Sequence, residues 1–155
     1  MKEKQISVTG GCLCGELRYE ATAAPTDGVF CHCSMCRKST GSLFSAGIFF
    51  NWTDFHFVQG EPKYYRSCEV ARHAFCENCS STIFVAYDEA PNLYIYVGSL
   101  DNPDDWPVST EGWCGHIFVD DKVSWYEIND RLPQHAASAG YYDAAKMQNE
   151  EKEST

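Results

Sequence analysis

Seven of the nine cysteines in this 155-residue chain fall into three tight groups. The groups are a C-x-C pair, a C-x-C-x-x-C triple and a C-x-x-C pair: Cys12 and Cys14; Cys31, Cys33 and Cys36; Cys76 and Cys79. Seven thiolates match the four ligands of a closed tetrahedral zinc site plus the three ligands of a site that keeps one position open. Because substrate binds at an open position, the sequence predicts one structural and one reactive metal centre.

The two cysteine pairs predict the closed centre. Side chains alternate along an extended segment, so Cys12 and Cys14 lie on the same side and converge on one ion. The turn from Cys76 to Cys79 aims two sulfurs at one metal, as in a zinc knuckle. A metal shared by pairs so far apart in sequence closes a long loop, and we therefore expect its role to be structural.

The triple of Cys31, Cys33 and Cys36 can reach one ion without help from elsewhere, and it leaves the fourth position open. Three thiolates give a zinc centre a net negative charge, which weakens its ability to acidify water and disfavours hydrolysis. A sulfur-rich site suits exchange of a fourth sulfur ligand, because a substrate thiol bound there becomes a nucleophilic thiolate at neutral pH. The adjacent Arg37 and Lys38 either support this thiolate or a substrate carboxylate, or are ordinary surface charges.

Spacing alone leaves other metal groupings open. The C-x-x-C within the triple and the later C-x-x-C together have the pattern of a zinc ribbon, which would leave Cys31 with the first pair. We favour the compact triple, because splitting Cys31 from Cys33 would send neighbours on one short segment to different metals. Sulfur-only ligation also suits an iron–sulfur cluster, with zinc as the default. Cys68 and Cys114 lack close cysteine partners and are interpreted as small buried hydrophobic side chains.

No general acid or base can be named from the sequence. On an extended segment His32 points away from the cysteines on either side of it, so we interpret it as a packed or surface histidine, with a hydrogen bond to a metal ligand or a proton shuttle as the alternatives. The remaining histidines have aromatic or apolar neighbours and are interpreted as partly buried strand residues: His56, His73, His116 and His135. The sequence contains no Ser-His-Asp order and no phosphate-binding loop.

Composition narrows the class of protein. The formal charge of −10 disfavours nucleic acid as a partner. The odd number of cysteines, with no signal sequence, favours metal binding in a reducing compartment over disulfides. The chain has no run approaching the roughly 18 apolar residues of a membrane span. We therefore expect a cytoplasmic protein with no membrane partner, and exposed strand edges would be compatible with a homodimer.

The elements that must position the cysteines are short strands, because β-branched and aromatic runs alternate with turn signals. The runs are at 15–22, 43–50, 54–58, 73–75, 82–87, 93–98, 116–119 and 123–128. They predict an antiparallel β domain in which the last two runs form a hairpin. One or two helical turns are expected at 34–41. We place the domain at 1–137 and expect 138–155 to be a partly helical or disordered extension.

With these residues in place, the chain resembles the glutathione-dependent formaldehyde-activating enzyme (Gfa) family, which also includes centromere protein V-like proteins. The resemblance covers residues from about 10 to 135 and depends on motifs in the same order. They are Gly11-Cys12-Leu13-Cys14-Gly15, Cys31-His32-Cys33-Ser34-Met35-Cys36-Arg37-Lys38 with Gly41, Phe75-Cys76-Glu77-Asn78-Cys79, and His116-Ile117-Phe118-Val119 with a tryptophan hairpin and Leu132-Pro133. The resemblance implies a mainly β fold, a β-tent of stacked antiparallel sheets with little helix and two zinc ions per chain.

The resemblance also implies roles for the cysteines. The ligands of the structural zinc would be Cys12, Cys14, Cys76 and Cys79, and those of the catalytic zinc would be Cys31, Cys33 and Cys36. The reaction attributed to the family's namesake is addition of glutathione to formaldehyde, which gives S-hydroxymethylglutathione, and members are classed as carbon–sulfur lyases. By resemblance we expect a lyase or synthase that acts on the adduct of a small thiol such as glutathione.

One feature keeps a second interpretation open. Without an acid or base, the chain is also compatible with a non-catalytic zinc module that binds a protein partner. The chain also departs from the family pattern at one position: the family usually has glycine after the second C-x-x-C, whereas this chain has Ser80. If that position requires a positive φ, serine costs a modest amount of stability there.

Overall fold

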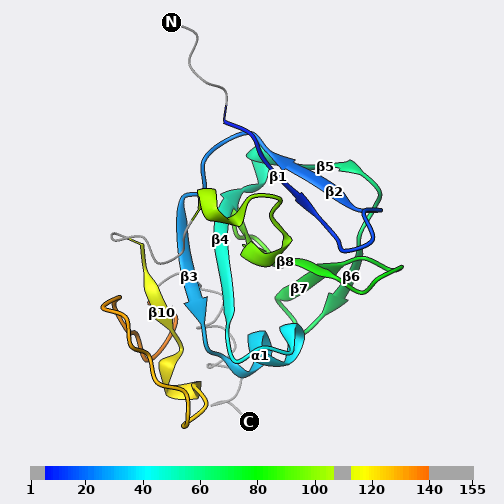
Figure 1. Cartoon of the computed structure of the whole chain (residues 1–155). Coiled ribbons are helices and arrows are strands. Elements are labelled where there is room, and N and C mark those ends of the chain that lie inside the picture. The colour runs from blue at the N-terminus through cyan, green and yellow to red at the C-terminus, as the bar shows by residue number, and fades with distance from the viewer. Residues whose placement is uncertain (1–5, 107–112, 140–155) are drawn as a thin grey trace, which may run out of the picture.

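The computed structural model describes residues 6–106 and 113–139, which form two β-sheets and, within these ranges, one α-helix (Figure 1). The strands are β1 (Val8–Gly11), β2 (Arg18–Ala21), β3 (Asp27–Cys31), β4 (Ser45–Asn51), β5 (Phe55–Gln59), β6 (Lys63–Arg66), β7 (Ala71–Phe75), β8 (Thr82–Tyr87), β9 (Asn92–Tyr96) and β10 (Gly115–Ile117). The helix is α1 (Ser34–Thr40), and short 3₁₀ turns are η1 (Trp52–Asp54), η2 (Val97–Ser99), η3 (Pro103–Asp105) and η4 (Val119–Asp121). The predicted mainly β class is confirmed.

The larger sheet has the strand order β10-β3-β4-β9-β8-β7-β6, and the smaller has the order β1-β2-β5. Every pairing is antiparallel except that of β10 with β3, which is parallel. The alternation of side chains along β4 sends Phe49 and Phe50 into two different apolar clusters. Phe50 packs with Tyr19 of the small sheet, whereas Phe49 packs with Cys31 and Cys36. One core therefore lies beside the small sheet, and the other supports the cysteine triple.

The predicted hairpin of 116–119 with 123–128 is wrong. Strand β10 ends at Ile117, Phe118 takes a left-handed conformation with φ of 54°, and 123–128 contains no strand. The free edge of β10 is instead taken by the segment at 133–137, whose backbone exchanges two 2.8 Å hydrogen bonds with His116. With β3 on one side and this segment on the other, β10 has no edge left for 123–128.

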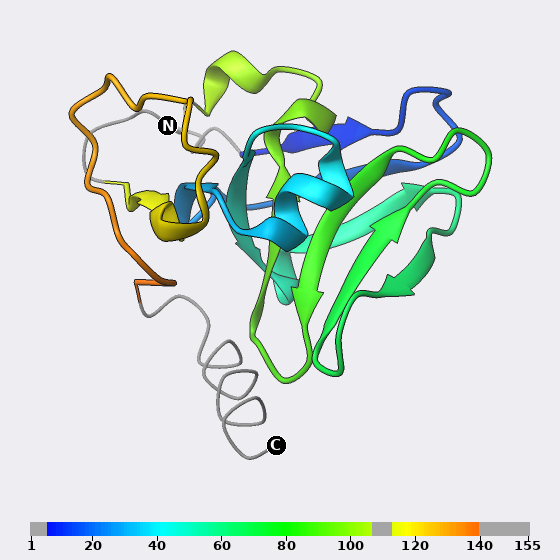
Figure 2. The same cartoon turned by 90° about the horizontal axis from the view of Figure 1, so that it is seen from below.

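The helical turns predicted at 34–41 are confirmed, and their boundaries follow from capping. The Cys33 sulfur caps the N-terminus of α1 by accepting from the Cys36 N–H at 3.3 Å. Gly41 ends the helix in the left-handed conformation and donates its N–H to the Arg37 carbonyl. In Figures 1 and 2, α1 lies at the end of β3 and β4. The helix therefore begins inside the cysteine triple and holds two of its members.

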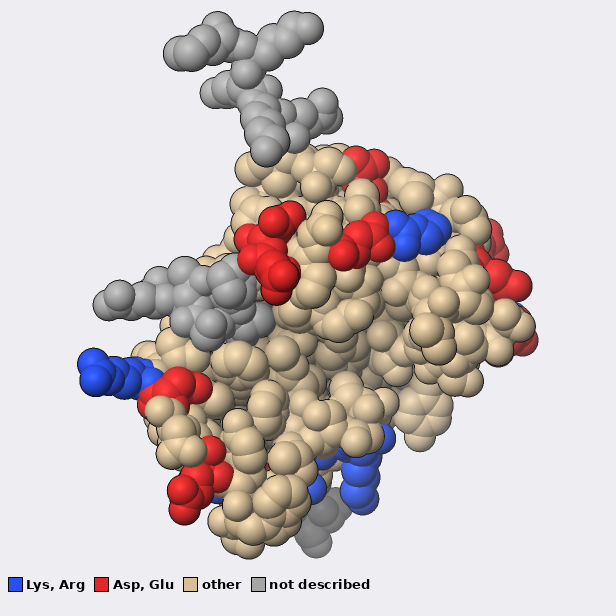
Figure 3. All heavy atoms as spheres, viewed as in Figure 1, with Lys and Arg blue, Asp and Glu red and all other residues tan. Residues whose placement is uncertain are grey.

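No helix among the described residues is long and apolar enough to cross a membrane. On the face in Figure 3, acidic side chains outnumber basic ones, and the described basic groups lie apart rather than in a continuous stripe. The predicted extension at 138–155 lies almost entirely outside the described residues, so the domain boundary at 137 stays a prediction.

Candidate metal centres and active site

The first candidate centre joins the two cysteine pairs. The sulfurs of Cys12, Cys14, Cys76 and Cys79 all lie within 4.8 Å of one another. Sulfur-to-sulfur distances are 3.5 Å for Cys12 to Cys14 and 3.7 Å for Cys14 to Cys76. Four sulfurs arranged tetrahedrally at about 2.3 Å from a zinc ion are about 3.8 Å apart. The spacing of this group therefore fits a tetrahedral zinc ion.

Hydrogen-bond donors around this group favour thiolates. The Leu17 N–H donates to the Cys12 sulfur at 3.2 Å, and the Ser81 hydroxyl lies 3.2 Å from the Cys79 sulfur. Hydrogen bonds from Ser81 lower the pKa of Cys79 to about 5. The Ser81 oxygen also accepts from the Leu13 N–H at 3.0 Å, which ties the two cysteine loops together.

The turn at the second pair contains the departure from the family pattern. Ser80 has φ of 63°, in the left-handed region, and its N–H donates to the Cys76 carbonyl at 2.8 Å. The position therefore does take a positive φ, and serine is strained there where glycine would not be.

The second candidate centre is the triple. The sulfurs of Cys31, Cys33 and Cys36 lie within 4.8 Å of one another, and no other His, Cys, Asp or Glu in the described ranges joins them. Cys31 and Cys36 are buried, and Cys33 is partly exposed. The triple is assembled locally, because Cys31 ends β3 and the other two cysteines form the first turn of α1. The zinc-ribbon alternative, which would pair Cys33 and Cys36 with the later C-x-x-C, is not the grouping that the structure forms.

The three sulfurs of the triple share protons. Hydrogen bonds from Cys31 and then from Cys36 lower the pKa of Cys33 to about 3. The hydrogen bond to Cys33, that to Cys36 and burial raise the pKa of Cys31. The result is a concentration of negative charge on sulfur at a largely buried position, which a bound cation would stabilise. The seven cysteines of the two centres form no disulfide in the structure, so no disulfide competes with metal binding there.

His32 lies between two cysteines of the triple but does not join them. It is fully buried, and its Nε2 is 2.9 Å from the Nδ1 of His116, whose Nε2 is 2.9 Å from Asp130. Its ring packs against Phe44 and Tyr126. Of the two positions expected for His32, packed or at the surface, the structure shows the packed one. Its contact with His116 fastens the segment after β10 to the end of β3.

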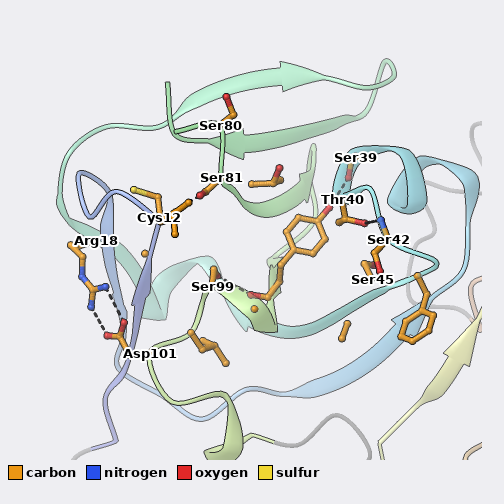
Figure 4. A pocket seen from close by; sticks show the side chains of 18 residues that line it. Cys12, Arg18, Ser39, Thr40, Ser42, Ser45, Ser80, Ser81, Ser99 and Asp101 are labelled. Atoms are coloured by element: carbon orange, nitrogen blue, oxygen red, sulfur yellow. Dashed lines mark hydrogen bonds and ion pairs between the residues drawn. The ribbon is translucent and has the colours of Figure 1, made fainter. Parts of the chain in front are cut away.

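Two cavities border α1. The larger has a volume of about 750 Å³ and is lined by Cys12 of the first centre and by many hydroxyl side chains. Figure 4 shows Ser39 and Ser45 on one side of it and the ion pair of Arg18 with Asp101 on the other. The smaller, of about 450 Å³, is lined by polar and aromatic side chains. Both cavities include Ser39, Ser80 and Thr82, whereas no sulfur of the triple lines either. The cavities therefore reach the helix that carries the triple.

Sequence reasoning missed a buried polar pair next to α1. The Tyr96 hydroxyl lies 3.2 Å from the Ser39 hydroxyl and 3.4 Å from Nδ1 of His73. Tyr96 lines the larger cavity and His73 the smaller. No sequence signal distinguishes Tyr96 from an ordinary inward-facing strand tyrosine, because its partners come from other elements. His73 was expected to be partly buried, and it is 4% exposed.

The sequence model of the glutathione-dependent formaldehyde-activating enzyme matches residues 7–116, more than half of the chain. The chain belongs to this family. Its match includes every cysteine of both centres, whereas Asp130 lies beyond it.

Relatives and a solved structure agree with this family and fold. An uncharacterized lyase of Schizosaccharomyces pombe is 32% identical over 124 residues, which cover 79% of this chain and 85% of that protein. A Halomonas elongata protein, whose provisional name is glutathione-dependent formaldehyde-activating enzyme, is 30% identical over 144 residues, with 86% and 88% covered. The crystal structure of a Rhodobacter sphaeroides protein aligns with a TM-score of 0.53 at 23% identity, over 70% of this chain and 98% of that one. The last likeness concerns the fold alone.

Proposed function

We propose that this Gfa-family protein is a zinc-dependent carbon–sulfur lyase or synthase that acts on the adduct of a small thiol and a carbonyl compound. The reactants that the family's name indicates are glutathione and formaldehyde. The observation that carries the proposal is the triple of Cys31, Cys33 and Cys36, which offers three clustered sulfurs and no fourth side-chain ligand among the described residues. Three protein ligands with one open position are the pattern of a reactive zinc site.

In this proposal the two centres have different tasks. The structural zinc ligands are Cys12, Cys14, Cys76 and Cys79, and the catalytic zinc ligands are Cys31, Cys33 and Cys36. A zinc ion at the triple would supply a Lewis acid that keeps a substrate thiol deprotonated at neutral pH. The protein's own contribution is to hold three sulfurs at a rigid helix start and to bind the rest of the thiol nearby.

The larger cavity supports a thiol that is bigger than a single functional group. Its volume of about 750 Å³ falls in the range of small-molecule sites. Hydroxyl groups and the Arg18–Asp101 ion pair on its wall suit a ligand with amide and carboxylate groups, such as a peptide thiol. We therefore assign the thiol-bearing substrate to this cavity.

Substitution of single cysteines tests the proposal. Cys36→Ser should leave the domain folded, remove one of two zinc ions and abolish formation and cleavage of S-hydroxymethylglutathione, whereas Cys76→Ser should unfold the domain. Cys68→Ser is the matched control, because Cys68 belongs to neither centre, and it should keep both ions and full activity. Metal analysis, circular dichroism and an assay of adduct turnover give the three readouts. If Cys36→Ser turns over the adduct at the wild-type rate, the catalytic assignment is wrong.

One observation favours the alternative of a non-catalytic zinc module: no sulfur of the triple lines either cavity. Under that alternative, wild-type protein loaded with two zinc ions neither forms nor cleaves the adduct of any small thiol. A cytoplasmic location and a homodimer stay predictions under both candidates.

A further inference from the structure

A chain of hydrogen bonds runs beneath α1 and connects the two cavities. It passes from Ser39 to Tyr96 at 3.2 Å, from Tyr96 to His73 at 3.4 Å, and from His73 Nε2 to the Ser67 hydroxyl at 3.0 Å. The Ser67 hydroxyl then donates to the Met35 sulfur at 3.2 Å. Tyr96 and His73 are 7% and 4% exposed, so the centre of this hydrogen-bond chain is buried. Even so, Tyr96 lines the larger cavity and His73 lines the smaller one.

Both ends of the chain rest on the helix that carries the triple. Met35 and Ser39 are four residues apart on α1, and Cys36 lies between them in sequence. Cys36 and Ser39 are three residues apart, so they share one face of the helix. The Tyr96 hydroxyl, bonded to Ser39, therefore lies under the face of α1 that presents Cys36. Tyr96 and Cys36 also belong to the same buried cluster.

Burial disfavours the charged phenolate form of a tyrosine, and Tyr96 is 7% exposed. The phenol therefore keeps its proton at neutral pH. Burial lowers the pKa of His73, which favours the neutral imidazole. A neutral imidazole with its proton on Nε2 leaves Nδ1 free to accept from Tyr96.

The proposed carbon–sulfur reaction needs a side chain that can give a proton to the substrate oxygen and take it back. When a thiolate adds to a carbonyl carbon, a sulfur–carbon bond forms and the π pair of the carbonyl moves to oxygen, which must gain one proton. The thiol has lost one proton in becoming the thiolate, so the overall reaction is proton-neutral. In the cleavage direction the hydroxyl oxygen gives up its proton as the sulfur–carbon bond breaks and sulfur keeps the electron pair.

We propose that Tyr96 is the catalytic acid and base at the substrate oxygen, and that His73 is the residue that positions it. When the thiolate adds to the carbonyl carbon, Tyr96 donates its proton to the substrate oxygen, and Nδ1 of His73 returns to Tyr96 the proton that the thiol released. In cleavage the same protons move in the opposite direction: Tyr96 accepts the hydroxyl proton as its own proton moves to Nδ1 of His73. This inference is built on the carbon–sulfur activity proposed above and names a residue role that the family match does not supply.

Tyr94, two residues earlier on β9, shows why Tyr96 is the better candidate. Its hydroxyl lies 3.0 Å from the Ser45 hydroxyl and 3.3 Å from the Val29 carbonyl, and it lines neither cavity. The Tyr94 hydroxyl therefore contacts both β4 and β3 and links these two strands. Tyr94→Phe therefore removes a buried strand hydroxyl without removing a group that faces a cavity, and it serves as the matched control.

The test compares adduct turnover in wild type, Tyr96→Phe and Tyr94→Phe, all loaded with two zinc ions. Tyr96→Phe should lower kcat about 100-fold or more, the usual contribution of a general acid, while KM for glutathione and the zinc content stay near wild type. Tyr94→Phe should keep the wild-type kcat and lower only the thermal midpoint. A solvent deuterium isotope effect on kcat, present in the wild type, should change in Tyr96→Phe and persist in Tyr94→Phe.

The role of His73 is tested by a conservative and a non-conservative replacement. His73→Asn keeps a polar atom near the position of Nδ1 and should retain more of kcat than His73→Phe, with KM unchanged in both. Wild-type kcat in Tyr96→Phe would overturn the inference while leaving the carbon–sulfur activity in place. A wild-type protein without turnover would instead overturn the proposed activity and the Tyr96 role with it.

Discussion

Ser80→Gly should stabilise the protein, although it removes a side chain from the loop of a metal centre. Ser80 has φ of 63°, and its hydroxyl makes no hydrogen bond within the described residues. The left-handed conformation costs a residue with a Cβ about 1–2 kcal/mol. Against this gain, glycine lowers the free energy of unfolding by about 0.5–1 kcal/mol, because it gives the unfolded chain more conformational freedom. The balance is a stabilisation of about 0.5–1 kcal/mol, or a rise of about 1–4 °C in the thermal midpoint.

The neighbouring Ser81 gives a matched control with the opposite sign. Its φ is not in the left-handed region, and its hydroxyl contacts both the Cys79 sulfur and the Leu13 N–H. Ser81→Gly removes these hydrogen bonds and gives the unfolded chain more conformational freedom. Its free energy of unfolding should therefore fall by about 1–2 kcal/mol.

Urea unfolding at saturating zinc measures both variants under conditions in which metal loading is equal. The m-value should stay constant, so that the shift in midpoint reports stability alone. A Ser80→Gly variant that is less stable than wild type, with an unchanged m-value, would refute the claim that backbone strain is stored at this position.

Two further predictions concern polar contacts that hold loops in place. Asp101→Asn, which removes the partner of Arg18, should cost about 0.5 kcal/mol at pH 7, because the pair is one-third exposed. The hydrogen bonds from Arg18 and Thr9 lower the pKa of Asp101, so this contribution is present above the unfolded pKa of about 3.9 and is lost as pH falls through the folded value. Urea midpoints of the two proteins should therefore converge at acid pH, and a gap that widens there contradicts the assignment. Asp130→Asn should weaken the 2.9 Å contact to His116, lower stability by about 1 kcal/mol and speed hydrogen exchange at the amides of His116 and Phe118. Unchanged exchange at those amides would mean that the contact does not hold the segment.

The parts of the fold that were predictable are those encoded locally. The run at 82–87 is a continuous stretch of β-branched and aromatic residues and forms β8 with the predicted bounds, and α1 lies within the range 34–41 that was predicted to be helical. The run at 123–128 has an equally good local pattern, but β10 takes its neighbours from β3 and from 133–137. Which segment pairs with the edge of β10 depends on the other segments that can reach that edge, and a local sequence pattern does not contain this information.

The candidate site divides in the same way. Cysteine spacing predicted both sulfur groups, because ligands that share a metal must lie close together and short spacings achieve this directly. Tyr96 and His73 could not be predicted, since the pair is made by β9 and β7 and is meaningful only beside α1. Their residue types and neighbours are those of ordinary core positions on strands.

X-ray absorption at the zinc edge, before and after addition of glutathione, tests the central claim most directly. Seven cysteine sulfurs shared by two ions predict about 3.5 sulfur ligands per zinc in the free protein. Binding of one thiol at the triple should raise this average to about 4 and leave the total zinc unchanged. A shell that already contains four sulfurs per zinc without glutathione, or one that glutathione does not alter, would contradict an open position for sulfur at Cys31, Cys33 and Cys36.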